Sequence, residues 1–275
     1  MQLLVGAIIF VLGTAIGSFL SVVVHRLHTH TKGIIASRSM CPACKKQLKW
    51  RHLVPIFSWI FLRGRCAYCG TKISSHYLTL ELSTGLVFLA TFLSFNFLNI
   101  IPLTTNPAFF DYSIDWHVFQ LFIFFIIEFS LLIGIFFYDF LYKEIPDTLS
   151  ITAIILALAK GLMFHDPTFS NMLIGGLGIF CFFLLQLLVS KGKWIGGGDL
   201  RMGLLIGVLL GWEKALLALV IAYVLGSIIG IYLIIKGKAT RRSAIAFGPF
   251  LVIGTTIVIF FGDFILNYYL SFVSI

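Results

Sequence analysis

Eight apolar segments dominate the chain, and most of them are about as long as a helix that crosses a membrane. About 20 apolar residues in an α-helix span the ~30 Å hydrocarbon core of a bilayer. Apolar residues make up 59% of the 275 residues and charged residues 11%, whereas a soluble domain has roughly 25% charged residues. The sequence therefore predicts a polytopic membrane protein. Its apolar segments lie near residues 2–24, 77–98, 118–138, 148–164, 170–190, 200–212, 214–235 and 248–271.

The segments are expected to be helices rather than the strands of a barrel. Within hydrocarbon, every backbone N–H and C=O group must be paired, which only helices and closed barrels achieve. Barrel strands alternate polar and apolar residues over about ten positions, and these segments do not. The predicted fold class is all-α, with about eight transmembrane helices, of which the sixth is short. The first segment lacks the basic residues with which a secretory signal begins, and it is longer than the apolar region of such a signal. We therefore expect it to remain in the protein as a membrane anchor.

The basic residues are unevenly distributed around these segments. Residues 25–76 contain ten of the twenty Lys and Arg residues and no Asp or Glu. Basic loops of membrane proteins stay on the cytoplasmic side, so we expect residues 25–76 to be cytoplasmic and both chain termini to lie outside. The net charge of +9 then reflects topology and attraction to anionic membrane lipid. It does not indicate a nucleic-acid partner.

Four cysteines in residues 25–76 form two C-x-x-C pairs with 21 residues between them, namely Cys41 with Cys44 and Cys66 with Cys69. This spacing is typical of four-cysteine zinc sites, in which two turns complete a tetrahedron of sulfur ligands. Disulfides are the alternative, and they fit poorly in a reducing cytoplasm. Because the protein would supply all four ligands, the predicted Zn²⁺ is structural. It would stabilise a loop domain that has few core residues of its own.

The acidic residues that lie within or at the ends of the apolar segments include Glu81, Glu128, Asp139 and Asp199. Ionisable groups are costly inside a membrane, which makes each of them a functional candidate. In the predicted topology, Asp139 ends the third segment and Asp199 begins the sixth on the same cytoplasmic face. The two aspartates can therefore form a pair. A further acid, Asp147, is predicted to cap the fourth helix at its N-terminus.

Asp139 and Asp199 have both structural and catalytic interpretations. Asp139 could pair with Lys143 one turn later, although a helix C-terminus is an unfavourable place for a carboxylate. Asp199, which follows three glycines, could simply cap the sixth helix. In a partly desolvated cleft, the two carboxylates would instead share a proton. One would then act as general base on water and the other as general acid toward a peptide carbonyl.

Several short motifs occur in order along nearly the whole chain. They are G-S-F-L at 17–20, H-R-L at 25–27, the two C-x-x-C pairs joined through P-I-F-S-W-I-F-L-R-G-R at 55–65, I-S-S-H-Y at 73–77 followed by Glu81, Y-D-F-L-Y-K-E-I-P-D at 138–147, G-G-G-D-L-R at 196–201 and F-G-P-F-L at 247–251. In this combination the chain resembles the bacterial type IV prepilin peptidases, which are G-x-G-D membrane aspartyl proteases of the bacterial inner membrane.

This resemblance implies an activity, a substrate class and the residues involved. It implies that Asp139 and Asp199 cut the short basic leader from type IV prepilins and pseudopilins on the cytoplasmic side, after a glycine. It also implies N-methylation of the new terminal residue with S-adenosylmethionine, and it places the four cysteines in the domain that accompanies methylation. The expected domains are a first transmembrane helix (1–24), a cytoplasmic zinc loop (25–76) and a membrane aspartyl protease domain (77–275). No residue is assigned to S-adenosylmethionine, and the oligomeric state stays open.

Two other functions are compatible with part of the sequence. A protease like presenilin or signal peptide peptidase shares the Y-D and G-x-G-D elements, but it lacks the tetracysteine loop and carries P-A-L where this chain has F-G-P-F-L. A transporter or membrane scaffold, with the zinc loop as a docking module, would place its acids near the bilayer midplane. Asp139 and Asp199 are instead expected at the cytoplasmic boundary.

Overall fold

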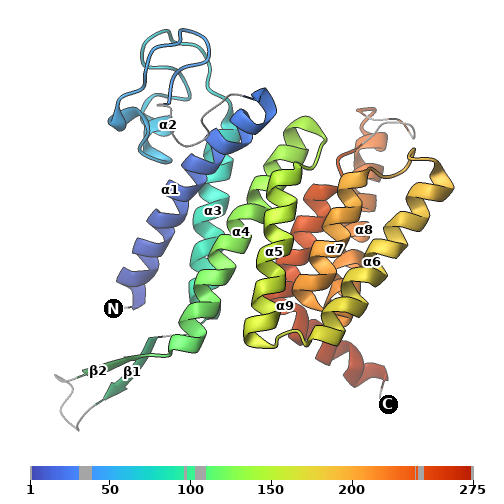
Figure 1. Cartoon of the computed structure of the whole chain (residues 1–275). Coiled ribbons are helices and arrows are strands. Elements are labelled where there is room, and N and C mark those ends of the chain that lie inside the picture. The colour runs from blue at the N-terminus through green and yellow to red at the C-terminus, as the bar shows by residue number, and fades with distance from the viewer. Residues whose placement is uncertain are drawn as a thin grey trace. The chain divides into compact units, whose positions relative to one another are not determined.

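The computed structural model describes residues 2–30, 39–95, 98–102, 110–238, 240 and 245–273. Within these residues the chain forms nine α-helices, one short 3-10 helix and one antiparallel hairpin (Figure 1). The elements are α1 (Gln2–Thr29), η1 (Trp50–His52), α2 (Phe57–Phe61), α3 (Ser75–Ser94), β1 (Leu98–Pro102), β2 (Phe110–Ile114), α4 (Trp116–Tyr142), α5 (Asp147–Phe164), α6 (Phe169–Ser190), α7 (Gly197–Leu210), α8 (Trp212–Ile235) and α9 (Gly248–Val273).

Seven helices in the described part of the chain are long and apolar enough to cross a membrane: α1, α3, α4, α5, α6, α8 and α9. They coincide with seven of the eight segments predicted from hydropathy, and the helical, polytopic fold class is confirmed. The hairpin of β1 and β2 was not predicted. It lies between α3 and α4, with Leu98 paired to Ile114 and Pro102 to Phe110.

The remaining predicted segment, the sixth at 200–212, forms α7, which has only 14 residues. A helix of this length rises about 21 Å, less than the roughly 30 Å of a hydrocarbon core. Ten of its residues are buried, and it packs against α5, α6, α8 and α9. A helix that is apolar on all sides belongs inside a bundle. The shortness of this segment is therefore explained by its central position.

Glycines allow α7 to approach α6 closely. A Cβ atom on Gly207 would overlap the backbone of Gly175, and one on Gly203 would lie 2.6 Å from the ring of Phe183. Small residues one turn apart are the usual means by which membrane helices pack backbone against backbone. This contact fixes the position of α7, which carries Asp199 in its first turn.

The chain divides into two compact units, residues 1–130 and 131–275. In the first unit, α1 packs along α3, and the apolar core there consists of Ile9, Phe88, Phe92, Phe122 and Ile126. The second unit contains the C-terminal end of α4 and the helices from α5 to α9. Both Asp139 and Asp199 belong to this second unit, and all four cysteines of the loop belong to the first.

Candidate active site and metal centre

Asp139 lies in the last turn of α4 and is only 4% exposed. Its Oδ2 atom accepts a hydrogen bond of 2.9 Å from the backbone N–H of Gly248, at the start of α9. The first N–H groups of a helix have no partner within that helix, and they carry its positive dipole end. The N-terminus of α9 therefore stabilises a carboxylate that the C-terminal end of α4 alone would disfavour.

Asp199 is the third residue of α7 and is 9% exposed. Its Oδ2 atom accepts a hydrogen bond of 3.0 Å from the backbone N–H of Gly196, the N-cap residue. This is the reaching-back half of a capping box. Asp199 thus caps α7, as one interpretation predicted, but it does so from inside the helix and with one of its two oxygens.

Both carboxylates line one pocket of about 480 Å³, which we call the aspartate pocket. Its other walls come from the α4–α5 loop, from the chain before α7 and from the chain before α9. Among the described residues, neither Oδ1 atom has a hydrogen-bond partner. The structure therefore brings the two aspartates together and leaves one oxygen of each for water or a substrate.

The four cysteines of the loop converge as well, and we call them the cysteine cluster. Their sulfur atoms all lie within 4.8 Å of one another, and the Sγ atoms of Cys41 and Cys69 are 3.8 Å apart. Zn–S bonds of ~2.3 Å in a tetrahedron place sulfurs about 3.8 Å apart. All four cysteines are free thiols rather than disulfides. The prediction that this cluster can hold a metal ion is confirmed.

The two halves of the cysteine cluster have the same backbone geometry. The N–H of Cys41 donates to the carbonyl of Lys46 at 3.0 Å, and the N–H of Cys66 donates to the carbonyl of Thr71 at 2.9 Å. In each half this bond closes a turn that begins at the first cysteine of a C-x-x-C pair. Each turn presents its two sulfurs on one side, as a metal site built from two such turns requires.

The protonation of the cysteine cluster also favours a metal ion. The hydroxyl and N–H groups of Thr71 lower the pKa of the Cys69 thiol to about 6. The backbone N–H of Cys44 lowers the pKa of Cys41. For Cys44 itself, the N–H of Lys46 lowers the pKa, but burial and the neighbouring sulfurs outweigh it and raise the pKa to about 11. Thiolate is the form that binds metal, and a cation would relieve the repulsion that holds the proton on Cys44.

Two family descriptions match the chain over the residues just described. The bacterial peptidase A24 N-terminal domain matches residues 11–95, which include the cysteine cluster. The type IV leader peptidase family matches residues 126–231, which include Asp139 and Asp199. The chain belongs to the type IV leader peptidase family. It is accordingly a multi-pass membrane protein, as its seven long apolar helices indicate.

Three curated relatives that match this chain over nearly their full length carry the name prepilin leader peptidase/N-methyltransferase. The protein from Bacillus subtilis (strain 168) is 29% identical, over 96% of this chain and 98% of its own. The protein from Legionella pneumophila is 28% identical, over 94% and 92%. The protein from Aeromonas salmonicida (strain A449) is 25% identical, over 96% and 94%. No solved structure matches the chain significantly.

Gly248 donates a hydrogen bond to Asp139, and the sequence had assigned no role to it. The motif F-G-P-F-L at 247–251 contributed only to the resemblance. A glycine followed by proline is a recognisable helix start, and α9 does begin at Gly248. That its N–H points at Asp139, 109 residues earlier, depends on the tertiary fold.

The other two acids of the apolar segments do not line the aspartate pocket. Glu81 is buried in α3, and its Oε2 atom accepts a hydrogen bond of 2.7 Å from the backbone N–H of Ile56. It thereby fastens the loop that carries the cysteine cluster to a membrane helix. Glu128 is fully buried in α4.

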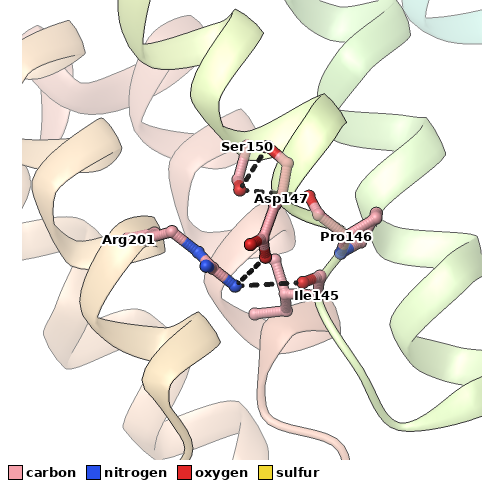
Figure 2. A network of polar contacts seen from close by, with 5 residues as sticks. All are labelled: Ile145, Pro146, Asp147, Ser150 and Arg201. Carbon is pink, nitrogen blue, oxygen red and sulfur yellow. Dashed lines mark hydrogen bonds and ion pairs between the residues drawn. The ribbon is translucent and has the colours of Figure 1, made fainter.

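The predicted capping role of Asp147 in this family member is wrong. Pro146 is the N-cap of α5, and its carbonyl accepts the first helical hydrogen bond, from the N–H of Ser150 at 3.1 Å. Asp147 is the first residue inside the helix, and its carboxylate forms an ion pair with Arg201 of α7. The same guanidinium donates to the carbonyl of Ile145 at 3.3 Å (Figure 2). A cation on a neighbouring helix therefore holds this carboxylate, which does not cap its own helix.

Proposed function

We propose that Asp139 and Asp199 form the catalytic dyad with which this chain cleaves the leader of type IV prepilins and pseudopilins. The observation that carries the proposal is that two buried acids of a leader peptidase, from distant parts of the chain, line one pocket. The pocket lies at the C-terminal end of α4 and the N-terminal end of α7. Glu144 is the one further acid that lines this pocket among the described residues.

The proposed reaction needs one proton shared by the pair. Two carboxylates in one desolvated pocket do not ionise together readily, so one is ionised and the other is protonated. The ionised carboxylate removes a proton from water as the water oxygen attacks the carbonyl carbon of the scissile peptide. The protonated one donates to the carbonyl oxygen. When the tetrahedral intermediate collapses, the C–N bond breaks and the amine leaves with a proton, so the net change is addition of one water.

The backbone donors have a defined part in this proposal. Gly248 and Gly196 each hold the Oδ2 atom of one aspartate at 2.9 and 3.0 Å. This leaves both Oδ1 atoms for water and substrate and restrains the carboxylates before a substrate arrives. Pre-positioned groups of this kind lower the barrier because little reorganisation remains to be done in the transition state.

We also propose that Cys41, Cys44, Cys66 and Cys69 hold a structural Zn²⁺ in a domain of residues 25–76 that serves N-methylation of the cut pilin. Four protein thiolates leave no open position on the metal, so it would organise the fold rather than act on a substrate. Residues 31–38 of this domain lie outside the described residues. S-adenosylmethionine would supply the methyl group, and we assign no residue of this chain to it. The remaining proposed domains are residues 1–24, the first transmembrane helix, and 77–275, the protease domain.

The proposed orientation in the bacterial inner membrane follows the distribution of basic residues. Residues 25–76 carry half of the Lys and Arg residues of the chain, which supports a cytoplasmic position. Both termini would then lie on the outer side. Prepilin leaders would be cut where they are made, at the cytoplasmic face.

The proposal is tested by co-expressing the chain with a prepilin in cells that lack their own prepilin peptidase. We expect mass spectrometry of the pilin N-terminus to show loss of the leader and the added mass of one methyl group. A pilin that keeps its leader would refute the peptidase function. A pilin that is cut but not methylated would refute the methyltransferase function alone.

Replacing Gly248 tests the positioning of Asp139. A Cβ atom at this position would lie 2.5 Å from Oδ2 and 3.2 Å from Cγ of Asp139, so the carboxylate must move. We expect Gly248→Ala to lower kcat/KM for prepilin cleavage by roughly 100-fold, as a displacement of about 1 Å can do. Gly230→Ala in α8 is the control, since its nearest neighbouring atom would be 3.8 Å away. Equal activity of both variants would contradict the role given to Gly248.

A further inference from the structure

The side chain of Ile145, in the α4–α5 loop, lies between the backbone supports of the two aspartates. A Cβ atom on Gly198 would lie 2.8 Å from the Cβ of Ile145, and one on Gly248 would lie 3.3 Å from its Cδ1. Gly198 directly precedes Asp199, and Gly248 donates to Asp139. One aliphatic side chain therefore touches the backbone next to each carboxylate. Because both contacts are with glycine, there is no intervening side chain that could absorb a shift of Ile145.

Arg201 fixes the loop that carries Ile145. It lies two residues after Asp199 on α7, so it moves with the helix that bears one of the aspartates. Its guanidinium donates to the carbonyl of Ile145 and pairs with Asp147, at the start of α5. Figure 2 shows the guanidinium reaching both acceptors from one side. The loop is thereby tied to α7 through its backbone and through the helix that follows it.

The start of α5 is fixed within itself as well. The hydroxyl of Ser150 donates to the carbonyl of Pro146 at 3.0 Å and to that of Asp147 at 3.2 Å (Figure 2). Because these bonds restrain the first turn of α5, the ion pair at Asp147 also limits movement of Ile145, which lies two residues earlier. The contacts thus connect the two aspartates without a gap. They run from Asp199 through Arg201 and Ile145 to Gly248 and Asp139.

We propose that Arg201 is a positioning residue, which holds the α4–α5 loop so that Ile145 sets the separation of Asp139 and Asp199. The inference rests on the proposed dyad. Arg201 and Ile145 also line the aspartate pocket, so a direct contact of Arg201 with the substrate would change KM, whereas positioning of the aspartates changes kcat. One nitrogen of the guanidinium, Nη2, contacts both the carbonyl of Ile145 and the carboxylate of Asp147. The planar guanidinium fixes the directions of its N–H groups, whereas the ammonium of lysine is a single point charge. Exposed ion pairs contribute little to stability, so the effect is expected on catalysis rather than on folding.

The chain contains a closely matched ion pair that serves as a control. Lys214 of α8 pairs with Asp263 of α9 at 2.8 Å, with side chains 33% and 78% exposed. The corresponding values for Arg201 and Asp147 are 31% and 67%. Both pairs join two helices of the same unit, and neither Lys214 nor Asp263 lines the aspartate pocket. A general loss of helix packing would affect the two pairs alike.

The experiment compares the purified full-length chain and its variants in proteoliposomes, with a prepilin as substrate. We expect Arg201→Met to lower kcat by about 10- to 100-fold and Asp147→Asn by a smaller factor, with KM changed less than about threefold. Arg201→Lys, which keeps the positive charge but not the planar guanidinium, should recover part of kcat. Lys214→Met and Asp263→Asn should keep the kcat of the unaltered chain, and the melting temperatures of all variants should be similar.

Ile145 provides a second and independent test. Ile145→Ala removes both glycine contacts and should lower kcat, whereas Ile145→Val keeps the branched Cβ and should lower it less. The inference is overturned if Arg201→Met and Ile145→Ala both cleave at the normal kcat, or if their losses merely follow a lower melting temperature. If Asp139→Asn or Asp199→Asn were active, the proposed dyad itself would fail. The two failures are therefore distinguishable.

Discussion

Asp139→Asn and Asp199→Asn, each made alone, should leave a co-expressed prepilin uncut, with the rate of cleavage lowered at least about 10³-fold. Asparagine has nearly the shape of aspartate and can still accept the backbone hydrogen bond from Gly248 or Gly196. It cannot take a proton from water or donate one from a carboxyl group. The loss would therefore report proton transfer rather than a change of packing.

Asp263→Asn is the matched control for these two variants. It is the same substitution in the same unit of the chain, at a carboxylate that is 78% exposed and lies outside the aspartate pocket. Immunoblotting of membrane fractions shows whether each variant is inserted, and the size of the prepilin shows whether it is cut. Normal processing by either aspartate variant, with the protein in the membrane, would rule out the dyad.

The second large effect is expected from the combined replacement Cys41→Ser and Cys44→Ser. Removing two of the four thiolates should release the proposed Zn²⁺, because two ligands cannot complete its tetrahedron. The roughly 10–16 kcal/mol that a structural zinc contributes to folding of such sites at neutral pH would then be lost. N-methylation of the pilin should be lost with it. Cleavage should persist, because the cysteine cluster and the aspartate pocket belong to different compact units of the chain.

Cys181→Ser provides the control for the cysteine variant. Cys181 is an exposed free thiol of α6 and is not a member of the cysteine cluster. Elemental analysis of the purified chains gives the zinc content, and mass spectrometry of the pilin gives cleavage and methylation separately. Full retention of zinc by the double variant would contradict a four-cysteine site.

Hydropathy predicted the helices well because the thickness of the bilayer sets their length. A continuous apolar stretch of that length can be recognised in each segment without knowledge of the others. It could not predict that the short α7 is enclosed by other helices, since this depends on the tertiary packing of α5, α6, α8 and α9 around it. The hairpin of β1 and β2 was missed for a similar reason: it lies in a connection where neither length nor apolar periodicity constrains the fold.

The candidate site was predictable to the extent that topology determines it. Alternating membrane crossings place Asp139 and Asp199 on one face of the membrane. The spacing of the two C-x-x-C pairs by itself indicates a four-cysteine metal site. The supports of these groups have no such signature. Gly248 acts through a backbone N–H, which every residue except proline has, and Arg201 is one basic residue among twenty. Asp147 was assigned to its own helix because sequence shows only local partners, whereas its partner lies 54 positions later, on α7.

The enclosure of α7 has a consequence for where this enzyme can work. Membranes differ in thickness, and helices that face lipid respond to a mismatch by tilting or by deforming the bilayer around them. Since α7 is largely covered by α5, α6, α8 and α9, its short apolar length is matched to protein rather than to lipid. The aspartate that it carries is thereby insulated from the bilayer, and the same site geometry can be kept in membranes of different lipid composition.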